Sequence, residues 1–81
     1  MHESGVIHKL LQIAFDEAER RGGELRAIDV RLGVLAGGSP DHLREHFEVE
    51  LRRRGATGIE LRIEEQPAYP GGVEITGIEL R

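Results

Sequence analysis

The first three residues of the chain, Met1, His2 and Glu3, offer nitrogen donors that could hold a metal ion. An α-amine titrates near ~7.7 and an imidazole near ~6.5, so both are neutral donors around neutral pH. With the adjoining backbone amide nitrogens, this set suits Ni(II) or Cu(II) in tetragonal geometry and suits oxygen-seeking ions such as Mg(II) poorly. Because removal of an initiator methionine requires a small second residue, we expect the amine to stay on Met1. By itself the motif also fits a disordered terminus without function.

Two further histidines, His42 and His46, have the i, i+4 spacing at which helical imidazoles can chelate one metal. No third ligand is identifiable beside them, and no HExxH arrangement surrounds them. We therefore favour the interpretation that His46 is a half-buried flank of an apolar helix face. His8 is expected to face solvent, with a role as an extra ligand beside His2 as the alternative.

Composition favours one small soluble domain over residues 1–81. The chain is 38% hydrophobic and 32% charged, which is typical of a globular protein, and it contains no cysteine. Disulfides, thiolate nucleophiles and the usual structural zinc sites are thereby excluded. A formal charge of -4 argues against general nucleic-acid binding. With no signal-peptide pattern and no membrane-spanning apolar run, we expect a cytoplasmic protein that does not bind membranes.

Apolar residues near the start of the chain recur at helical spacing and predict an amphipathic helix over residues 4–21. Gly22 and Gly23 are expected to end this helix, because glycine tolerates the left-handed conformation of a C-cap. Apolar and polar side chains then alternate over residues 28–33, which is the period of a half-buried strand. We expect this strand to break at residues 36–38, Ala-Gly-Gly.

A second helix is expected to open at Ser39 and Pro40, with the serine as N-cap and the proline at the first helical position. Gly55 is expected to close it. The basic run over residues 52–54 fits the end of this helix, where cations complement the helix dipole. Its apolar stripe is narrow and comprises Leu43, Phe47 and Leu51.

Alternation over residues 59–64 predicts the next strand, and the proline- and glycine-rich residues 66–72 predict a turn. Val73 and Ile75 begin a last strand, in which the inward-facing set changes phase at Gly77 and so predicts a bulge. The order of helix, strand, helix, strand, strand indicates an α+β fold. We expect a two-layer sandwich with both helices on one face of a small mixed sheet of three to four strands, the fourth being residues 1–3 extended along an edge.

Five segments carry a resemblance to a known family. Met-His-Glu at residues 1–3 precedes an amphipathic helix, and Val-Arg-Leu-Gly-Val-Leu-Ala-Gly at 30–37 ends a strand. Residues 39–48 match the pattern Pro-x-x-Leu-x-x-x-Phe-Glu, residues 54–63 form a glycine turn and strand, and residues 72–80 close with Ile-Glu-Leu. In this order the segments resemble the HypA/HybF family of nickel metallochaperones, which serve hydrogenase and urease maturation.

The chain departs from the family between its last two strands. Family members carry there a zinc module with two Cys-x-x-Cys pairs, whereas residues 66–72 join the strands directly. The resemblance therefore implies a nickel domain without zinc. Ser4 and Gly5 also stand where the family usually has an apolar residue followed by a small one.

The resemblance implies Ni(II) held by the amine of Met1, by His2 and by backbone nitrogen at Glu3, whose carboxylate is favoured as a nearby acceptor or partner contact over a ligand. It implies a metallochaperone that is not an enzyme and that passes Ni(II) to a hydrogenase maturation GTPase and a hydrogenase large subunit. The alternative is a docking or scaffold protein of the same fold that does not carry metal. The sequence leaves open whether the chain forms a homodimer.

Overall fold

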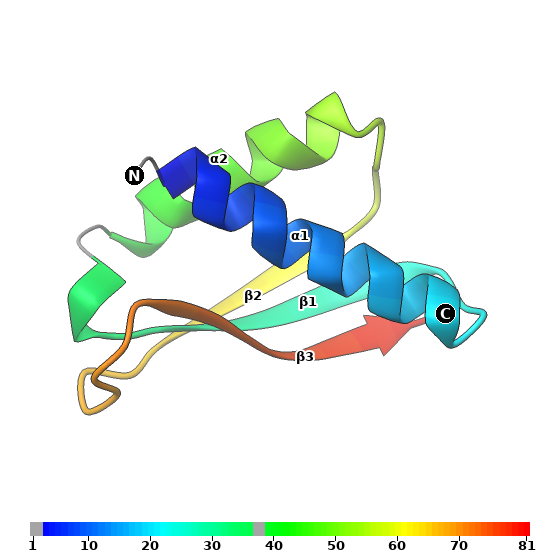
Figure 1. Cartoon of the computed structure of the whole chain (residues 1–81). Helices are drawn as coiled ribbons and strands as arrows, with labels where there is room; N and C mark the ends of the chain where they lie inside the picture. Colours follow the sequence, from blue (N-terminus) through cyan, green and yellow to red (C-terminus); the bar gives the residue numbers. More distant parts are fainter. Residues whose placement is uncertain (1–2, 37–38) are drawn as a thin grey trace.

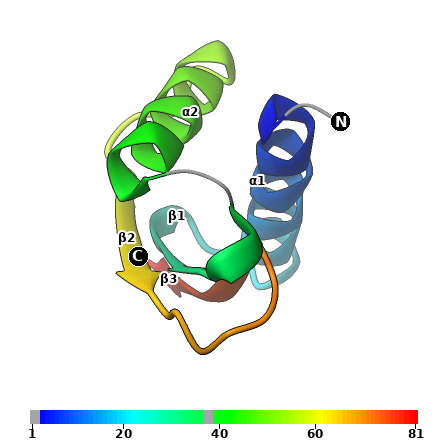
Figure 2. The same cartoon turned by 90° about the vertical axis from the view of Figure 1, so that its left-hand side faces the viewer.

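Figure 1 shows the computed structural model of the chain, which describes residues 3–36 and 39–81. The elements in order are α1 (Glu3–Arg20), β1 (Leu25–Leu32), the short 3₁₀ helix η1 (Val34–Ala36), α2 (Pro40–Arg53), β2 (Glu60–Glu65) and β3 (Val73–Leu80). Both helices lie on the same face of the sheet (Figures 1 and 2). The predicted α+β sandwich is therefore confirmed, with three strands in the described part of the chain.

The strand order is β2-β1-β3, so β1 is the central strand. It pairs in parallel with β2 and antiparallel with β3. Parallel strands need a long crossover connection, and α2 supplies it. The register shifts where Asp29 pairs with Gly77 and Val30 pairs with Ile75, which leaves Thr76 as the extra residue. The bulge predicted at Gly77 is thus confirmed.

The core lies between the helices and the sheet. Phe47 of α2 is fully buried and lies among apolar residues of α1 and β1. Most residues of the predicted inward faces of α1, β1 and α2 are buried, but Val6, which also belongs to the predicted apolar set of α1, is 36% exposed. The buried members are Ile7, Leu11, Ala14, Ala18, Ile28, Val30, Leu32, Leu43, Phe47 and Leu51.

The helix ends form as their residues dictate. Gly22 and Gly55 both adopt positive φ, 72° and 69°, in the left-handed region that favours glycine. At the start of α2, the Ser39 hydroxyl accepts a hydrogen bond of 3.2 Å from the backbone N–H of His42, and Pro40 occupies the first helical position.

Two boundaries differ from those predicted. Glu3 is the first residue of α1, so the expected extended strand over residues 1–3 is wrong at Glu3, and Met1 and His2 lie outside the described residues. The strand β1 ends at Leu32 and not near residue 36, because the chain then bonds to the 66–72 turn. The Gly33 N–H donates to the Gly72 carbonyl at 2.8 Å, and the Leu35 N–H donates to the Gly71 carbonyl at 2.9 Å.

Candidate metal site

Of the three predicted metal ligands, only Glu3 belongs to α1. Met1 and His2 lie outside the described residues, while Glu3 opens the helix. The first four N–H groups of an α-helix have no acceptor within the helix. The amide nitrogen of Glu3 can therefore bind a metal without breaking a helical hydrogen bond.

One turn further along α1, His8 contacts α2. Its Nδ1 lies 2.9 Å from Oε2 of Glu50, and the side chain of His8 is 60% exposed. The predicted solvent exposure is confirmed, but the ring is bound to a carboxylate from the other helix. The bond from His8 chiefly lowers the pKa of Glu50, and the charges of His8, Arg53 and Arg54 act in the same direction, although burial opposes them.

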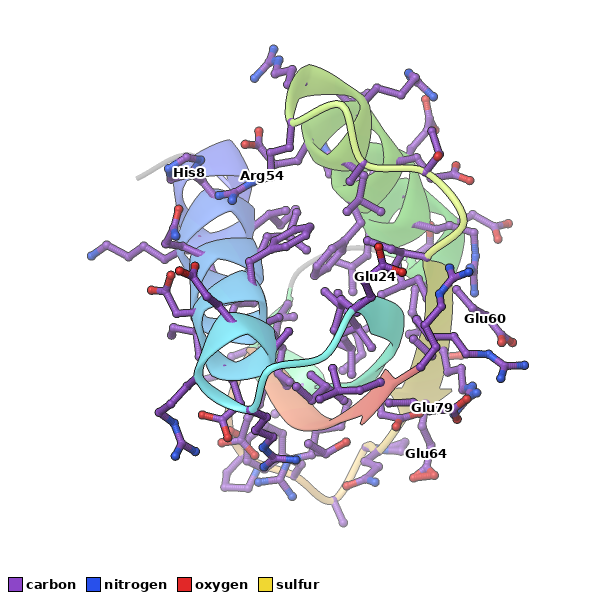
Figure 3. All side chains as sticks on the ribbon, turned by 90° about the vertical axis from the view of Figure 1, so that its right-hand side faces the viewer. His8, Glu24, Arg54, Glu60, Glu64 and Glu79 are labelled. Carbon is purple, nitrogen blue, oxygen red and sulfur yellow. The ribbon has the colours of Figure 1, made fainter. Side chains whose placement is uncertain are left out.

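Arg54, at the end of α2, completes the contact between the helices. Its guanidinium donates to the His8 carbonyl at 3.2 Å and to the side-chain oxygen of Gln12 at 3.3 Å. It also lies 5.3 Å from the centre of the Phe15 ring. Figure 3 shows His8 and Arg54 directed toward each other. The basic run at residues 52–54 is thus the end of a helix, as predicted.

These contacts fix the relative direction of the helices. His8 meets Glu50, and Gln12, one turn later on α1, meets Arg54, one turn later on α2. The two helices therefore run in the same general direction, with their N-terminal ends at the same end of the molecule (Figure 1).

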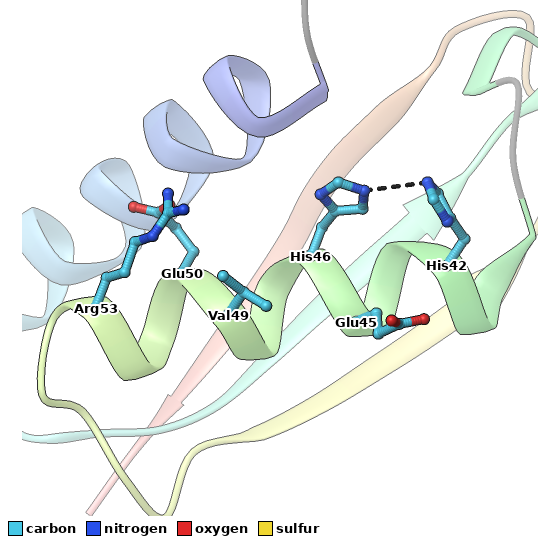
Figure 4. A pocket seen from close by; sticks show the side chains of 6 residues that line it. All are labelled: His42, Glu45, His46, Val49, Glu50 and Arg53. Carbon is cyan, nitrogen blue, oxygen red and sulfur yellow. Dashed lines mark hydrogen bonds and ion pairs between the residues drawn. The ribbon is translucent and has the colours of Figure 1, made fainter.

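The two histidines near the start of α2 touch each other. Nε2 of His46 lies 3.0 Å from Nε2 of His42, and the ring centroids are 4.5 Å apart at an interplanar angle of 68°. His46 is half-buried, as predicted for a flanking residue, and His42 is exposed. They line an open groove of about 260 Å³ along α2 (Figure 4), together with Glu45, Val49, Glu50 and Arg53.

Glu17, on the outer face of α1, forms ordinary helical ion pairs. Glu17 binds Arg20 and Arg21 at 2.5 and 2.6 Å. Within residues 3–36 and 39–81, no group of three or more histidine, aspartate or glutamate side chains could enclose a metal ion. No helix in this part of the chain has the length and apolar character needed to cross a membrane.

Comparison with known proteins covers most of the chain. Residues 1–70 match the family described as hydrogenase/urease nickel incorporation, metallochaperone, hypA. The chain belongs to the HypA family. A hydrogenase maturation factor HypA of Chloroflexus aurantiacus is 38% identical over 68 residues, which is 83% of this chain and 60% of that protein. A hydrogenase maturation factor HypA of Chlorobaculum tepidum is 36% identical over 81 residues, 99% of this chain and 71% of that protein.

The HypA match begins at the first residue and extends into the turn between β2 and β3. This chain thus spans 60% of the length of its Chloroflexus aurantiacus relative. Residues 66–72 form a compact turn, in which the centre of the Tyr69 ring lies 3.7 Å from the guanidinium carbon of Arg31. An added Cβ at Gly33 would lie 2.4 Å from the Gly71 carbonyl, so the turn packs tightly against the end of β1.

Proposed function

We propose that this HypA-family chain is a nickel-binding metallochaperone domain that captures Ni(II) at Met1, His2 and Glu3 and passes it to a partner protein. The observation that carries the proposal is the family match, which includes these three residues and continues to residue 70. The donors are the α-amine, the His2 imidazole and backbone nitrogen, and nickel is the cargo.

The start of α1 suits this donor set for a structural reason. The amide of Glu3 lies among the N–H groups that a helix leaves unbonded. The positive end of the helix dipole opposes a bound cation by about 0.3–1 kcal/mol. Amide nitrogens that bind as anions offset this penalty, because they cancel the charge of Ni(II).

The carboxylate of Glu3 has a separate role in this proposal. It is not needed to complete a nitrogen donor set, so we assign it to contact with the partner, where a charge tunes encounter and orientation. The receiving partners are a hydrogenase maturation GTPase and a hydrogenase large subunit, or their urease counterparts. An open nitrogen site suits transfer because the incoming ligand must reach the metal.

The deciding experiment is Ni(II) titration of the chain with a free N-terminus. We expect a Ni(II) site that needs His2. Loss of a residue that only hydrogen-bonds a metal ligand typically costs about 10–100-fold in metal affinity, so His2→Ala, which removes a ligand itself, should weaken Ni(II) binding at this site by more than that. An N-terminal extension that converts the amine to an amide should act similarly. His8→Gln is the matched control, because it removes a histidine of α1 without touching the donor set.

Retention of full Ni(II) affinity by His2→Ala or by the extended chain would contradict the proposal and favour the docking or scaffold alternative. The role of Glu3 is tested by Glu3→Gln. We expect slower transfer per bound nickel with little change in affinity, whereas a collapse of affinity would make Glu3 a ligand.

A further inference from the structure

We infer that His42 and His46 form a second metal-binding site, a two-histidine chelate on α2 for a divalent ion that prefers imidazole nitrogen, namely Ni(II), Cu(II) or Zn(II). This site does not depend on the donors at Met1 and His2. The inference rests on the contact between the two rings and not on the spacing of the residues alone.

The separation of the two nitrogen atoms fits a shared metal. A divalent ion of this class binds imidazole nitrogen at about 2.0–2.1 Å. Two such ligands in neighbouring coordination positions then lie roughly 2.9–3.4 Å apart, as follows from metal angles between 90° and the tetrahedral value. The Nε2 atoms of His42 and His46 are 3.0 Å apart.

The helix holds both rings in place for this purpose. Residues four apart on an α-helix lie on one face, one above the other. His46 is half-buried and flanks Phe47, which is fully buried, so the backbone that carries the ring is anchored in the core. His42 is exposed at the first turn of α2 and can turn its Nε2 toward an incoming ion. Figure 4 shows the two rings on the same side of α2.

The surroundings leave room for the remaining ligands. The groove beside the rings holds about 260 Å³ and includes the carboxylate-bearing Glu45 and Glu50. Waters can therefore complete the coordination, and the exposed Glu45 offsets part of the charge of the ion, whereas Glu50 is buried and already bound to His8 and two arginines. Arg53 is a neighbour of opposite effect, but it binds Glu50 at 3.4 Å.

The histidine pair also lies near the first turn of α1. His8 meets Glu50, and one turn back on each helix brings His46 level with the first turn of α1. A metal on the histidine pair would thus lie near the end of α1 that begins with Glu3 (Figure 4).

Zn(II) titration of the full chain carrying His2→Ala tests this site separately from the first. Zn(II) is the probe because, unlike Ni(II) and Cu(II), it does not readily displace amide protons. We expect one Zn(II) per chain, and a further His42→Gln or His46→Gln change should weaken its binding at least about tenfold, because a bidentate chelate becomes a single donor. His8→Gln, the control on α1, removes an imidazole that is not part of the pair and should leave the Zn(II) affinity unchanged.

Nitrogen-15 NMR of the imidazoles supplies a second measurement. Zn(II) should move the Nε2 signals of His42 and His46 together, with the same dependence on metal concentration. A Zn(II) affinity unchanged by His42→Gln, a response from only one ring, or no binding in His2→Ala would overturn the inference. The N-terminal site is tested independently by Ni(II) titration of a chain that carries His42→Gln and His46→Gln. If Ni(II) affinity in that chain is the same with and without His2→Ala, the N-terminal site is wrong whatever the result for the histidine pair.

Discussion

Two regions of the molecule contain ion pairs: the contact between α1 and α2, and the outer face of the sheet. They differ in how far the paired side chains are exposed to water. Between the helices, Glu50 is 7% exposed and binds His8, Arg53 and Arg54. On the sheet, Arg62 binds Glu79 at 2.8 Å and Asp29 at 3.5 Å, and each of these side chains is about 40% exposed. Figure 3 shows Glu60 and Glu79 at the sheet, away from His8 and Arg54.

The difference shows where a charged side chain matters to the fold. The pairing with Glu79 raises the pKa of Arg62, and the same pairing lowers the pKa of Glu79. Water can replace either partner there, so these shifts carry little stability. Glu50 is covered by protein, so loss of its partners would leave its buried carboxylate without hydrogen bonds, which costs stability. All the described histidines also lie on the helices, on the same side of the sheet as the buried Glu50.

The largest loss of stability is expected from truncating Phe47, which packs between the helices and the sheet. Phe47→Ala should cost about 3–5 kcal/mol of unfolding free energy, because it empties a fully buried volume between helices and sheet. Urea unfolding measures it. Ile13→Ala, at a residue that is 60% exposed, is the control and should change stability by less than about 0.5 kcal/mol. A small loss for Phe47→Ala would mean that the two layers do not share one core.

Glu50→Ala should destabilise the fold by roughly 1–2 kcal/mol, through lost hydrogen bonds to charged groups. This value lies at the low end of what hydrogen bonds to charged groups contribute, because His8 is exposed and can bind water instead. Glu48→Ala, at an exposed position of the same helix, should have almost no effect. A double-mutant cycle with His8→Ala isolates the pair, and zero coupling would show that Glu50 acts without His8.

Acidification should remove the contribution of Glu50. Its pKa is lowered in the folded protein, so its stabilising effect is fully present above the unfolded pKa of about 4.3 and is lost as pH falls through the folded pKa. The stability difference between wild type and Glu50→Gln, measured by thermal unfolding, should therefore narrow below about pH 4.3. A difference independent of pH would contradict the assigned charge interaction.

Arg62→Ala should shift the melting temperature by less than about 2 °C, because its partners on the sheet remain hydrated. Added salt should reduce even this shift, since exposed pairs are screened. A loss as large as that of Glu50→Ala would mean that the two regions do not differ as described.

The smallest effect is expected from metal removal. A strong chelator should leave the melting temperature within about 2 °C, because the core formed by the described residues is apolar and contains no metal ligand. Circular dichroism during heating measures this. A drop of many degrees would reveal a structural metal.

Much of the fold was predictable because its causes are local. Ser39 and Pro40 start α2, and glycines with positive φ follow both helices, because these residues favour such conformations wherever they occur. Alternation identified the strands, and the phase change at Gly77 identified the bulge. The end of β1 was misplaced because the chain after it bonds to a turn more than thirty residues later, which no local pattern contains.

For the site, the sequence by itself predicted which residues could donate to a metal, and only the structure showed which histidine and glutamate side chains contact each other. Met1, His2 and Glu3 are defined by chemical type and position, and they remain a prediction. The sequence placed His42 and His46 one turn apart, but only the packed helix brings their nitrogens to 3.0 Å. The bond between Glu50 and His8, 42 residues apart, was decided by the tertiary structure, because it forms only when both helices cover the same face of the sheet.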